Sequence, residues 1–94
     1  MKATKVKGKS NKHKVLLYAL STCVWCKKAK KLLADNSIEY EYVDVDLCSD
    51  GEYEQIRDDI TRRGGHVSFP TLIIDDEKLI TGFDEDEIRE ALEI

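Results

Sequence analysis

The sequence has no apolar run that could cross a membrane, because a spanning helix needs about 20 consecutive apolar residues. Residues 15–20 form an uninterrupted apolar stretch of only six residues. A secretory signal would need an apolar segment behind its basic residues, and residues 1–14 contain none. We therefore expect no membrane segment and a cytoplasmic location. With 94 residues the chain is long enough for one domain with a core, but not for two.

Cysteine is scarce as well, with three residues at positions 23, 26 and 48. Small secreted domains held together by disulfides carry an even set of cysteines, so three cysteines fit a disulfide framework less well. In a reducing compartment, disulfides are mostly transient and catalytic. The cysteine content therefore favours reactive thiols over structural crosslinks.

Acidic residues are absent from residues 1–14, which carry six lysines. The other nine basic residues stand against all 19 acidic ones, so residues 15–94 have a net charge of −10. An acidic domain does not favour nucleic-acid binding. Residues 1–14 show no hydrophobic period and are interpreted as a basic, disordered tail before a domain at residues 15–94. The alternative is an arm that docks onto an acidic partner.

Hydrophobic periodicity and turn signals predict seven elements in the order β-α-β-α-β-β-α. The expected strands cover residues 15–20, 38–47, 71–74 and 79–81, and the expected helices cover about 22–35, 50–63 and 85–92. Asn36 is expected to be a left-handed helix end, and two capping boxes open the later helices: Ser49 with Glu52, and Asp84 with Glu87. The first strand–helix–strand unit should be parallel, and the last two strands form an antiparallel hairpin. These features predict an α/β fold with a four-stranded mixed sheet and three helices.

Cys23 and Cys26 lie where an apolar strand passes into a helix. The first turn of a helix has unpaired backbone N–H groups and a dipole that favour an anion, and the thiolate is the reactive form of cysteine. Three residues make nearly one turn, which brings Cys26 within reach of Cys23. Lysines at positions 27, 28, 30 and 31 add positive potential. The pair predicts a redox site in which Cys23 attacks a disulfide and Cys26 resolves the mixed disulfide.

Other interpretations of these residues remain open. Structural zinc usually takes four ligands in two close pairs, and His13, His66 and Cys48 supply no second pair, so no metal is predicted. Cys48 is expected to be a small buried hydrophobe, with a regulatory thiol as the alternative. Trp25 could belong to the core, but its position between two redox residues favours a substrate-facing surface. Pro70, the only proline, precedes an apolar strand, where either isomer is allowed, and the general rarity of cis bonds favours trans.

From about residue 15 to residue 92 the chain resembles a glutaredoxin, a member of the thioredoxin-fold superfamily. The resemblance rests on Cys23-Val24-Trp25-Cys26 behind an apolar strand, on Ser68-Phe69-Pro70, and on Thr81-Gly82-Phe83-Asp84 before the last helix. It implies a thioredoxin-like fold, a nucleophilic Cys23, a resolving Cys26 and a cis Pro70, which reverses the expectation from the residues alone. A cis Pro70 would place the backbone of Phe69 beside the sulfurs, free to pair with an extended substrate. The implied substrate-binding residues are Trp25, Phe69, Pro70, Gly82, Phe83 and Asp84.

The chain is also similar to the glutaredoxin-like redoxins that serve ribonucleotide reductase, which share the Cys-Val-x-Cys pattern and a Gly-Phe before the last helix. Those redoxins take electrons from a flavin or similar reductase. Glutaredoxins usually carry a lysine three residues before the first cysteine, where this chain has Leu20. The electron donor therefore stays open between glutathione and a reductase.

The expected function is that of a cytoplasmic dithiol–disulfide oxidoreductase, an electron carrier in cell redox homeostasis that reduces protein or small-molecule disulfides. It is expected to hold no permanently bound cofactor, to be a monomer, and to have neither nucleic-acid nor membrane partners. Two rival functions remain. One is an iron–sulfur carrier in which two chains share a cluster through Cys23 and a small thiol. The other is an adaptor redoxin whose basic arm docks onto its partner.

Overall fold

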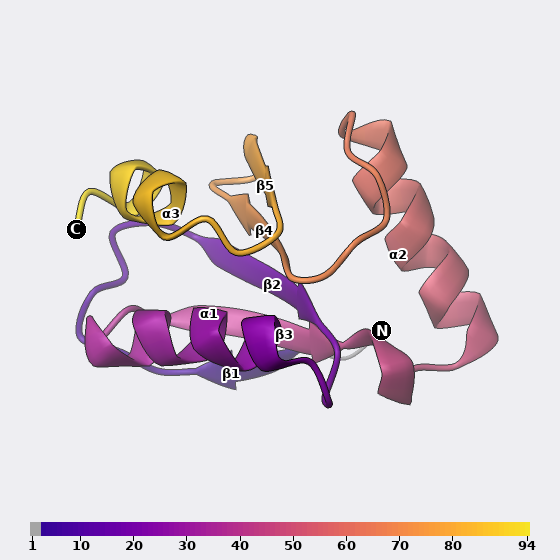
Figure 1. Ribbon diagram of the computed structural model, residues 1–94, viewed down its shortest axis with the longest axis horizontal. Helices are drawn as coiled ribbons and strands as arrows, with labels where there is room; N and C mark the ends of the chain where they lie inside the picture. The colour runs from indigo at the N-terminus through magenta and orange to yellow at the C-terminus, as the bar shows by residue number, and fades with distance from the viewer. Residues whose placement is uncertain (1–2) are drawn as a thin grey trace.

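The computed structural model describes residues 3–94 and contains a five-stranded mixed sheet with three α-helices (Figure 1). The strands lie in the order β1-β3-β2-β4-β5, and β2 and β3 are parallel while the other neighbours are antiparallel. Their bounds are Thr4–Val6 for β1, Val15–Ala19 for β2, Tyr40–Asp44 for β3, Thr71–Ile74 for β4 and Lys78–Thr81 for β5. The predicted mixed sheet with three helices is confirmed, with one strand more than expected.

The helices cover both faces of the sheet, with α1 (Val24–Asp35) and α3 (Glu85–Leu92) on one face and α2 (Asp50–Arg62) on the other (Figure 1). Alternate residues of β2 point to opposite faces. Leu17 therefore packs in one core cluster with α1 and α3, and the next residue, Tyr18, packs in the other with α2. A strand buried on both faces explains the unbroken apolar run in the sequence.

The strand predicted over residues 38–47 is shorter than expected. It ends at Asp44, and Val45–Leu47 turn into a short 3-10 helix, η1, that leads to α2. The predicted left-handed end of α1 lies one residue later than expected: Asn36 has φ −98°, and Ser37 has φ 56°. The Asn36 side-chain amide instead donates to the Leu32 carbonyl at 2.9 Å, which closes the helix end by another route.

The expectation of disorder over residues 1–14 is wrong for the part of this segment that the structure describes, and residues 1–2 lie outside the described residues. Strand β1 pairs antiparallel with β3, and Ser10 bridges to Ile38 further along the same edge. The physical reason is the edge of β3, which offers unpaired backbone groups to any extended segment. Opposite charge helps, because Lys5 lies 3.6 Å from Glu39 in an ion pair.

We call residues 3–14 the N-terminal arm. Its last residues, 12–14, contact the hairpin turn between β4 and β5 and the end of α3. The Lys14 backbone N–H donates to Asp75 at 2.9 Å, and His13 Nδ1 lies 2.7 Å from the other carboxylate oxygen of Asp75. Lys12 pairs with Glu93 behind α3. Lys5, Lys12 and Lys14 therefore all pair with acidic residues of the same chain.

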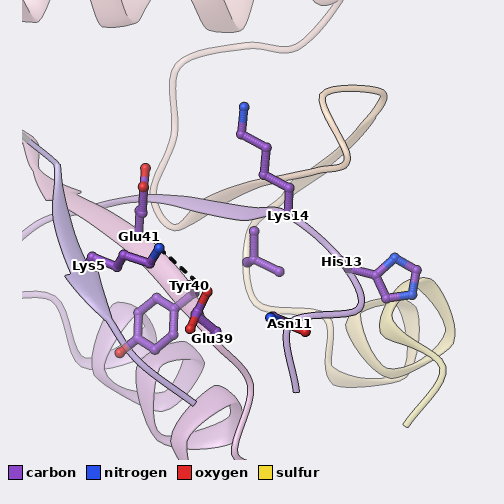
Figure 2. Close-up of a pocket in the computed structure, with 8 residues that line it drawn as sticks. Lys5, Asn11, His13, Lys14, Glu39, Tyr40 and Glu41 are labelled. Carbon is purple, nitrogen blue, oxygen red and sulfur yellow. Dashed lines mark ion pairs between the residues drawn. The ribbon is translucent and has the colours of Figure 1, made fainter. Parts of the chain in front are cut away.

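A pocket of about 350 Å³ lies where the arm meets the starts of β2 and β3 (Figure 2). Its lining residues are Lys5, Asn11, His13, Lys14, Val15, Glu39, Tyr40 and Glu41. In Figure 2 the His13 ring points away from Tyr40, toward the end of α3.

The strand directions determine where a site can form. Strand β5 runs in the same direction as β2, because both are antiparallel to β4. The segments that follow β2, β3 and β5, and the segment that precedes β4, therefore all lie at one end of the sheet. The pocket of Figure 2 lies at the opposite end. None of the helices within residues 3–94 is long and apolar enough to cross a membrane.

Candidate active site

Cys23 follows the turn after β2 and is the N-cap residue of α1, with φ −85° and ψ 123°. Its sulfur accepts a hydrogen bond from the Cys26 backbone N–H at 3.3 Å, as a capping side chain does. The side chain is partly exposed and the thiol is free. The sequence expectation of a thiol at the start of a helix is confirmed.

Cys26 lies one turn along α1 and is fully buried among the residues of the first core cluster. Its sulfur accepts the Leu20 backbone N–H at 3.4 Å, which anchors the thiol to the end of β2. The two cysteines therefore differ sharply in their surroundings although they are three residues apart.

The pKa values of the two thiols move in opposite directions. Burial raises the pKa of Cys23, but hydrogen bonds from the Cys26 thiol and from the backbone N–H groups of Cys26 and Trp25 outweigh it, so the pKa lies below the ordinary 9.0. Burial, together with donation of its proton toward Cys23, raises the pKa of Cys26 to about 12. A nucleophile and a protonated partner are the states that thiol–disulfide exchange needs.

The lysines behind the pair act less directly than the sequence suggested. Lys31 pairs with Asp35 at 3.0 Å, and Lys28 lies over the Trp25 ring at 4.5 Å. Lys30 pairs with Asp44 at 3.2 Å, and its charge lowers the pKa of Cys26. The low pKa of Cys23 comes from hydrogen bonds at the helix end.

Pro70 begins the segment opposite the end of β2, and the Phe69–Pro70 peptide bond is cis. The expectation drawn from the glutaredoxin resemblance is confirmed, and the trans preference drawn from the residues alone is wrong. Pro70 is fully buried, and Phe69, partly exposed, packs against both core clusters. The Gly82 N–H donates to the Pro70 carbonyl at 2.7 Å, which ties the start of the last loop to this corner.

Trp25 is exposed, which confirms the expectation of a surface position over a core one. Its ring stacks on Phe83 with centroids 6.1 Å apart and an interplanar angle of 27°. This stacking joins the start of α1 to the loop between β5 and α3, two segments that are far apart in the sequence. Gly82 precedes Phe83 and has φ 82°, in the left-handed region that favours glycine.

Asp84 is the N-cap of α3, and its carboxylate accepts the Glu87 backbone N–H at 3.1 Å. Asp84 therefore caps α3 as predicted, but only this half of its predicted box with Glu87 is present, whereas Ser49 and Glu52 form the predicted box in full. The carboxylate of Asp84 is exposed at the same end of the sheet as Cys23. The substrate-binding role assigned to it stays a prediction.

The remaining candidate residues lie apart from the thiol pair. Cys48 follows η1, is only partly buried, and directs its thiol to the Asp44 carbonyl at 3.6 Å, while burial raises its pKa. His66 is exposed in the loop before Pro70. Over residues 3–94 no three histidine, cysteine or acidic side chains gather in a way that could hold a metal ion.

Sequence reasoning missed one contact that shapes the site. Both the backbone N–H and the hydroxyl of Ser21 donate to the Asp46 carboxylate, at 2.9 and 2.5 Å. These hydrogen bonds also lower the pKa of Asp46. They tie the turn before Cys23 to η1, and the only sequence signal was a serine and an aspartate at strand ends that a parallel pair brings together.

Comparisons with known proteins agree with this arrangement. The family model described as glutaredoxin matches residues 15–80. A glutaredoxin 1 of Rickettsia prowazekii is 34% identical over 68 residues, which cover 72% of this chain and 68% of that protein. The crystal structure of a glutaredoxin from Methanosarcina mazei has a TM-score of 0.88 and 49% identity, covering 98% of this chain and 88% of the other. The structure of Methanosarcina acetivorans methanoredoxin has a TM-score of 0.80 and 52% identity, covering 86% and 85%. With its thiol pair on a thioredoxin-like fold, the chain belongs to the glutaredoxin family.

Proposed function

We propose that this protein is a dithiol–disulfide oxidoreductase that reduces disulfides through Cys23 and Cys26. The observation that supports this most is the geometry of the two thiols: the partly exposed Cys23 sulfur accepts the Cys26 backbone N–H at 3.3 Å, and the Cys26 thiol is buried one turn along α1. In these surroundings hydrogen bonds lower the pKa of Cys23 against the effect of burial, and burial raises the pKa of Cys26. A pair of this kind is suited to attack and then to resolution.

The reaction proceeds in two exchanges. The Cys23 thiolate attacks one sulfur of the substrate disulfide, forms a mixed disulfide, and releases the other substrate sulfur as a thiolate. The Cys26 thiol gives its proton to the departing thiolate, and its sulfur then displaces the remaining substrate sulfur from Cys23. This second substrate sulfur leaves as a thiolate and takes a proton from water, which replaces the proton that Cys23 lost on ionising. The protein ends with a Cys23–Cys26 disulfide, and the substrate has gained two electrons and two protons.

The substrate is proposed to lie across the residues that meet beside Cys23. An extended substrate segment would pair with the backbone of Phe69, next to the cis Pro70. The stacked rings of Trp25 and Phe83 would form the apolar side of this site, and Gly82 and Asp84 would border it. A donor dithiol, or two molecules of glutathione, would return the two electrons, and a reducing cytoplasm is the proposed location.

The test uses Trp25, the only tryptophan of the chain, as a reporter of the cysteine pair. The reduced protein is mixed with excess bis(2-hydroxyethyl) disulfide in a stopped-flow instrument, and tryptophan emission is followed. We expect Cys23→Ser to abolish the reaction, Cys26→Ser to stop at a mixed disulfide visible by mass spectrometry, and Cys48→Ser to react like the wild type. A Cys23→Ser variant with full activity would remove the proposed nucleophile.

The same material separates the electron donors and the iron–sulfur alternative. Turnover is measured with glutathione plus its reductase, and in parallel with a thioredoxin-type reductase, so that the donor is identified by the system that turns over. Anaerobic purification followed by a visible spectrum and iron analysis tests the alternative. If the purified protein contained stoichiometric iron and reduced no disulfide, the proposed activity would be rejected in favour of an iron–sulfur cluster carrier.

A further inference from the structure

Exposed apolar side chains gather at the end of the sheet that carries Cys23. Among residues 3–94, four large hydrophobic side chains are strongly exposed: Val24 at 63%, Trp25 at 55%, Leu47 at 73% and Ile94 at 39%. Val24 and Trp25 directly follow Cys23 in the sequence, and Leu47 ends η1, which follows β3. Only Ile94 lies elsewhere, at the far end of α3 (Figure 1).

The sheet order places these residues on different flanks of Cys23. Strand β2, which leads to Cys23, lies between β3 and β4. Leu47 therefore lies on the β3 flank, whereas Pro70 lies on the β4 flank. A short peptide paired with the backbone of Phe69 covers the β4 flank and leaves Leu47 in water.

The β3 flank is held in a fixed position relative to the reactive sulfur. The two hydrogen bonds from Ser21 to Asp46 join the turn before Cys23 to η1, in which Leu47 directly follows Asp46. Leu47 is the most exposed of the four side chains. It lies in a segment that is hydrogen-bonded to the turn before Cys23. Together with Val24 and Trp25, Leu47 puts three exposed apolar side chains at this end of the sheet, and a gathering of exposed apolar side chains marks an interaction surface.

The charge around Leu47 indicates what kind of surface would meet it. The carboxylates of Asp46 and Asp50, before and after Leu47 in the sequence, are exposed, whereas Asp44 and Glu54 pair with Lys30 and Arg57. Complementary charge on a partner favours the encounter and suppresses wrong partners. The mixed disulfide itself brings the partner close, because disulfide geometry holds the two Cα atoms about 4.4–6.8 Å apart.

Building on the proposed function, we infer that the disulfide substrate is a protein that covers both flanks of Cys23, buries Leu47, and presents basic residues to Asp46 and Asp50. Small disulfides react at Cys23 without touching Leu47. The two substrate classes should therefore differ in their dependence on Leu47.

The experiment compares one variant on two disulfides. Reduced wild type, Leu47→Ser and Ile94→Ser are each mixed with scrambled ribonuclease A, a basic protein without tryptophan, and with bis(2-hydroxyethyl) disulfide, while Trp25 emission is followed. We expect Leu47→Ser to lower the second-order rate constant with ribonuclease about three- to tenfold, the loss expected for one apolar contact, and to leave the small-disulfide rate unchanged. Ile94→Ser is the matched control and should change neither rate.

Each other outcome overturns the inference. An unchanged ribonuclease rate means that no protein surface covers Leu47, and an equal loss with both disulfides means that Leu47 acts on Cys23 through the Ser21–Asp46 contact. Sedimentation of the wild type as a dimer that Leu47→Ser converts to a monomer would assign the surface to a second copy of this chain. A wild type that reduces neither disulfide would instead reject the proposed function, so the two failures are distinct.

Discussion

Replacing Cys26 with alanine tests the origin of the low pKa of Cys23. The Cys23 sulfur accepts hydrogen bonds from the Cys26 thiol and from the backbone N–H groups of Cys26 and Trp25. Cys26→Ala removes the thiol donor and keeps both backbone donors. Cys26→Ser keeps a donor in nearly the same position. The two variants therefore separate the contribution of the Cys26 side chain to the pKa of Cys23 from that of the backbone N–H groups at the helix end.

The magnitude follows from the strength of a hydrogen bond to an ionised acceptor, about 1.5–3 kcal/mol. Because Cys23 is partly exposed, solvent screening favours the low end, about 1.5 kcal/mol, which corresponds to roughly a tenfold change in an equilibrium constant. We expect Cys26→Ala to make the acid dissociation constant of Cys23 about tenfold smaller, and Cys26→Ser to change it less.

The assay is the ultraviolet absorbance of the thiolate against pH in a Cys48→Ala background. Cys23 is then the only thiol of the two Cys26 variants, and in the parent Cys26 titrates far above it, with a pKa of about 12. In the wild type, the rate of attack on a small disulfide should rise with pH and level off below 9.0, since the pKa of Cys23 is lowered by these hydrogen bonds against the effect of burial. The plateau should move to higher pH in Cys26→Ala. An unchanged titration in Cys26→Ala would show that the backbone donors alone determine the pKa and would refute the reasoning.

Two further predictions concern the packing of the helices and the arm. Tyr18→Phe removes the 2.7 Å hydrogen bond to Asp59 and should lower the free energy of unfolding in urea by about 1.5–3 kcal/mol, and a loss under about 0.5 kcal/mol would contradict it. Burial raises the pKa of Asp59, but its hydrogen bonds, of which the one from Tyr18 is the strongest, bring the pKa below 3.8. The stabilisation by ionised Asp59 is therefore present above pH 3.8 and is lost as the pH falls through the lowered pKa. The decrease in the free energy of unfolding at acid pH should be smaller in Tyr18→Phe than in the wild type. A Cβ at Gly8 would lie 2.4 Å from the Ser37 carbonyl oxygen, so Gly8→Ala should detach β1 and speed its amide hydrogen exchange, while Gly51→Ala, with nothing within 4 Å, should leave β1 protected.

The sequence was sufficient for the elements whose signals are local. The start of α2 at Ser49 and the start of α3 at Asp84 follow from side chains that cap a helix three residues away. The position of Cys23 at the start of α1 follows in the same way, because it needs only an apolar strand, a turn and a helical pattern. The isomer of Pro70 is different: the residues alone favoured trans, and only the resemblance to a family indicated cis.

Features formed by segments that are distant in the sequence were decided only by the tertiary structure. Residues 4–6 carry no hydrophobic period, and they form a strand because β3 has a free edge and Glu39 lies within ion-pair distance of Lys5. Trp25 and Phe83 are 58 positions apart, and their stacking cannot be inferred from spacing along the chain. The Ser21–Asp46 contact likewise requires the ends of two parallel strands to lie side by side.

The difference between the features that the sequence determined and those that tertiary structure decided has one physical reason. Helix caps, strand alternation and the reach of Cys26 to Cys23 act between residues within about one turn of each other, so the sequence by itself determined the thiol pair and the elements that carry it. Edge pairing, ring stacking and carboxylate contacts between loops join residues that only folding brings together. Tertiary structure therefore decided that a basic arm becomes part of the sheet and that Leu47 is presented beside the reactive sulfur.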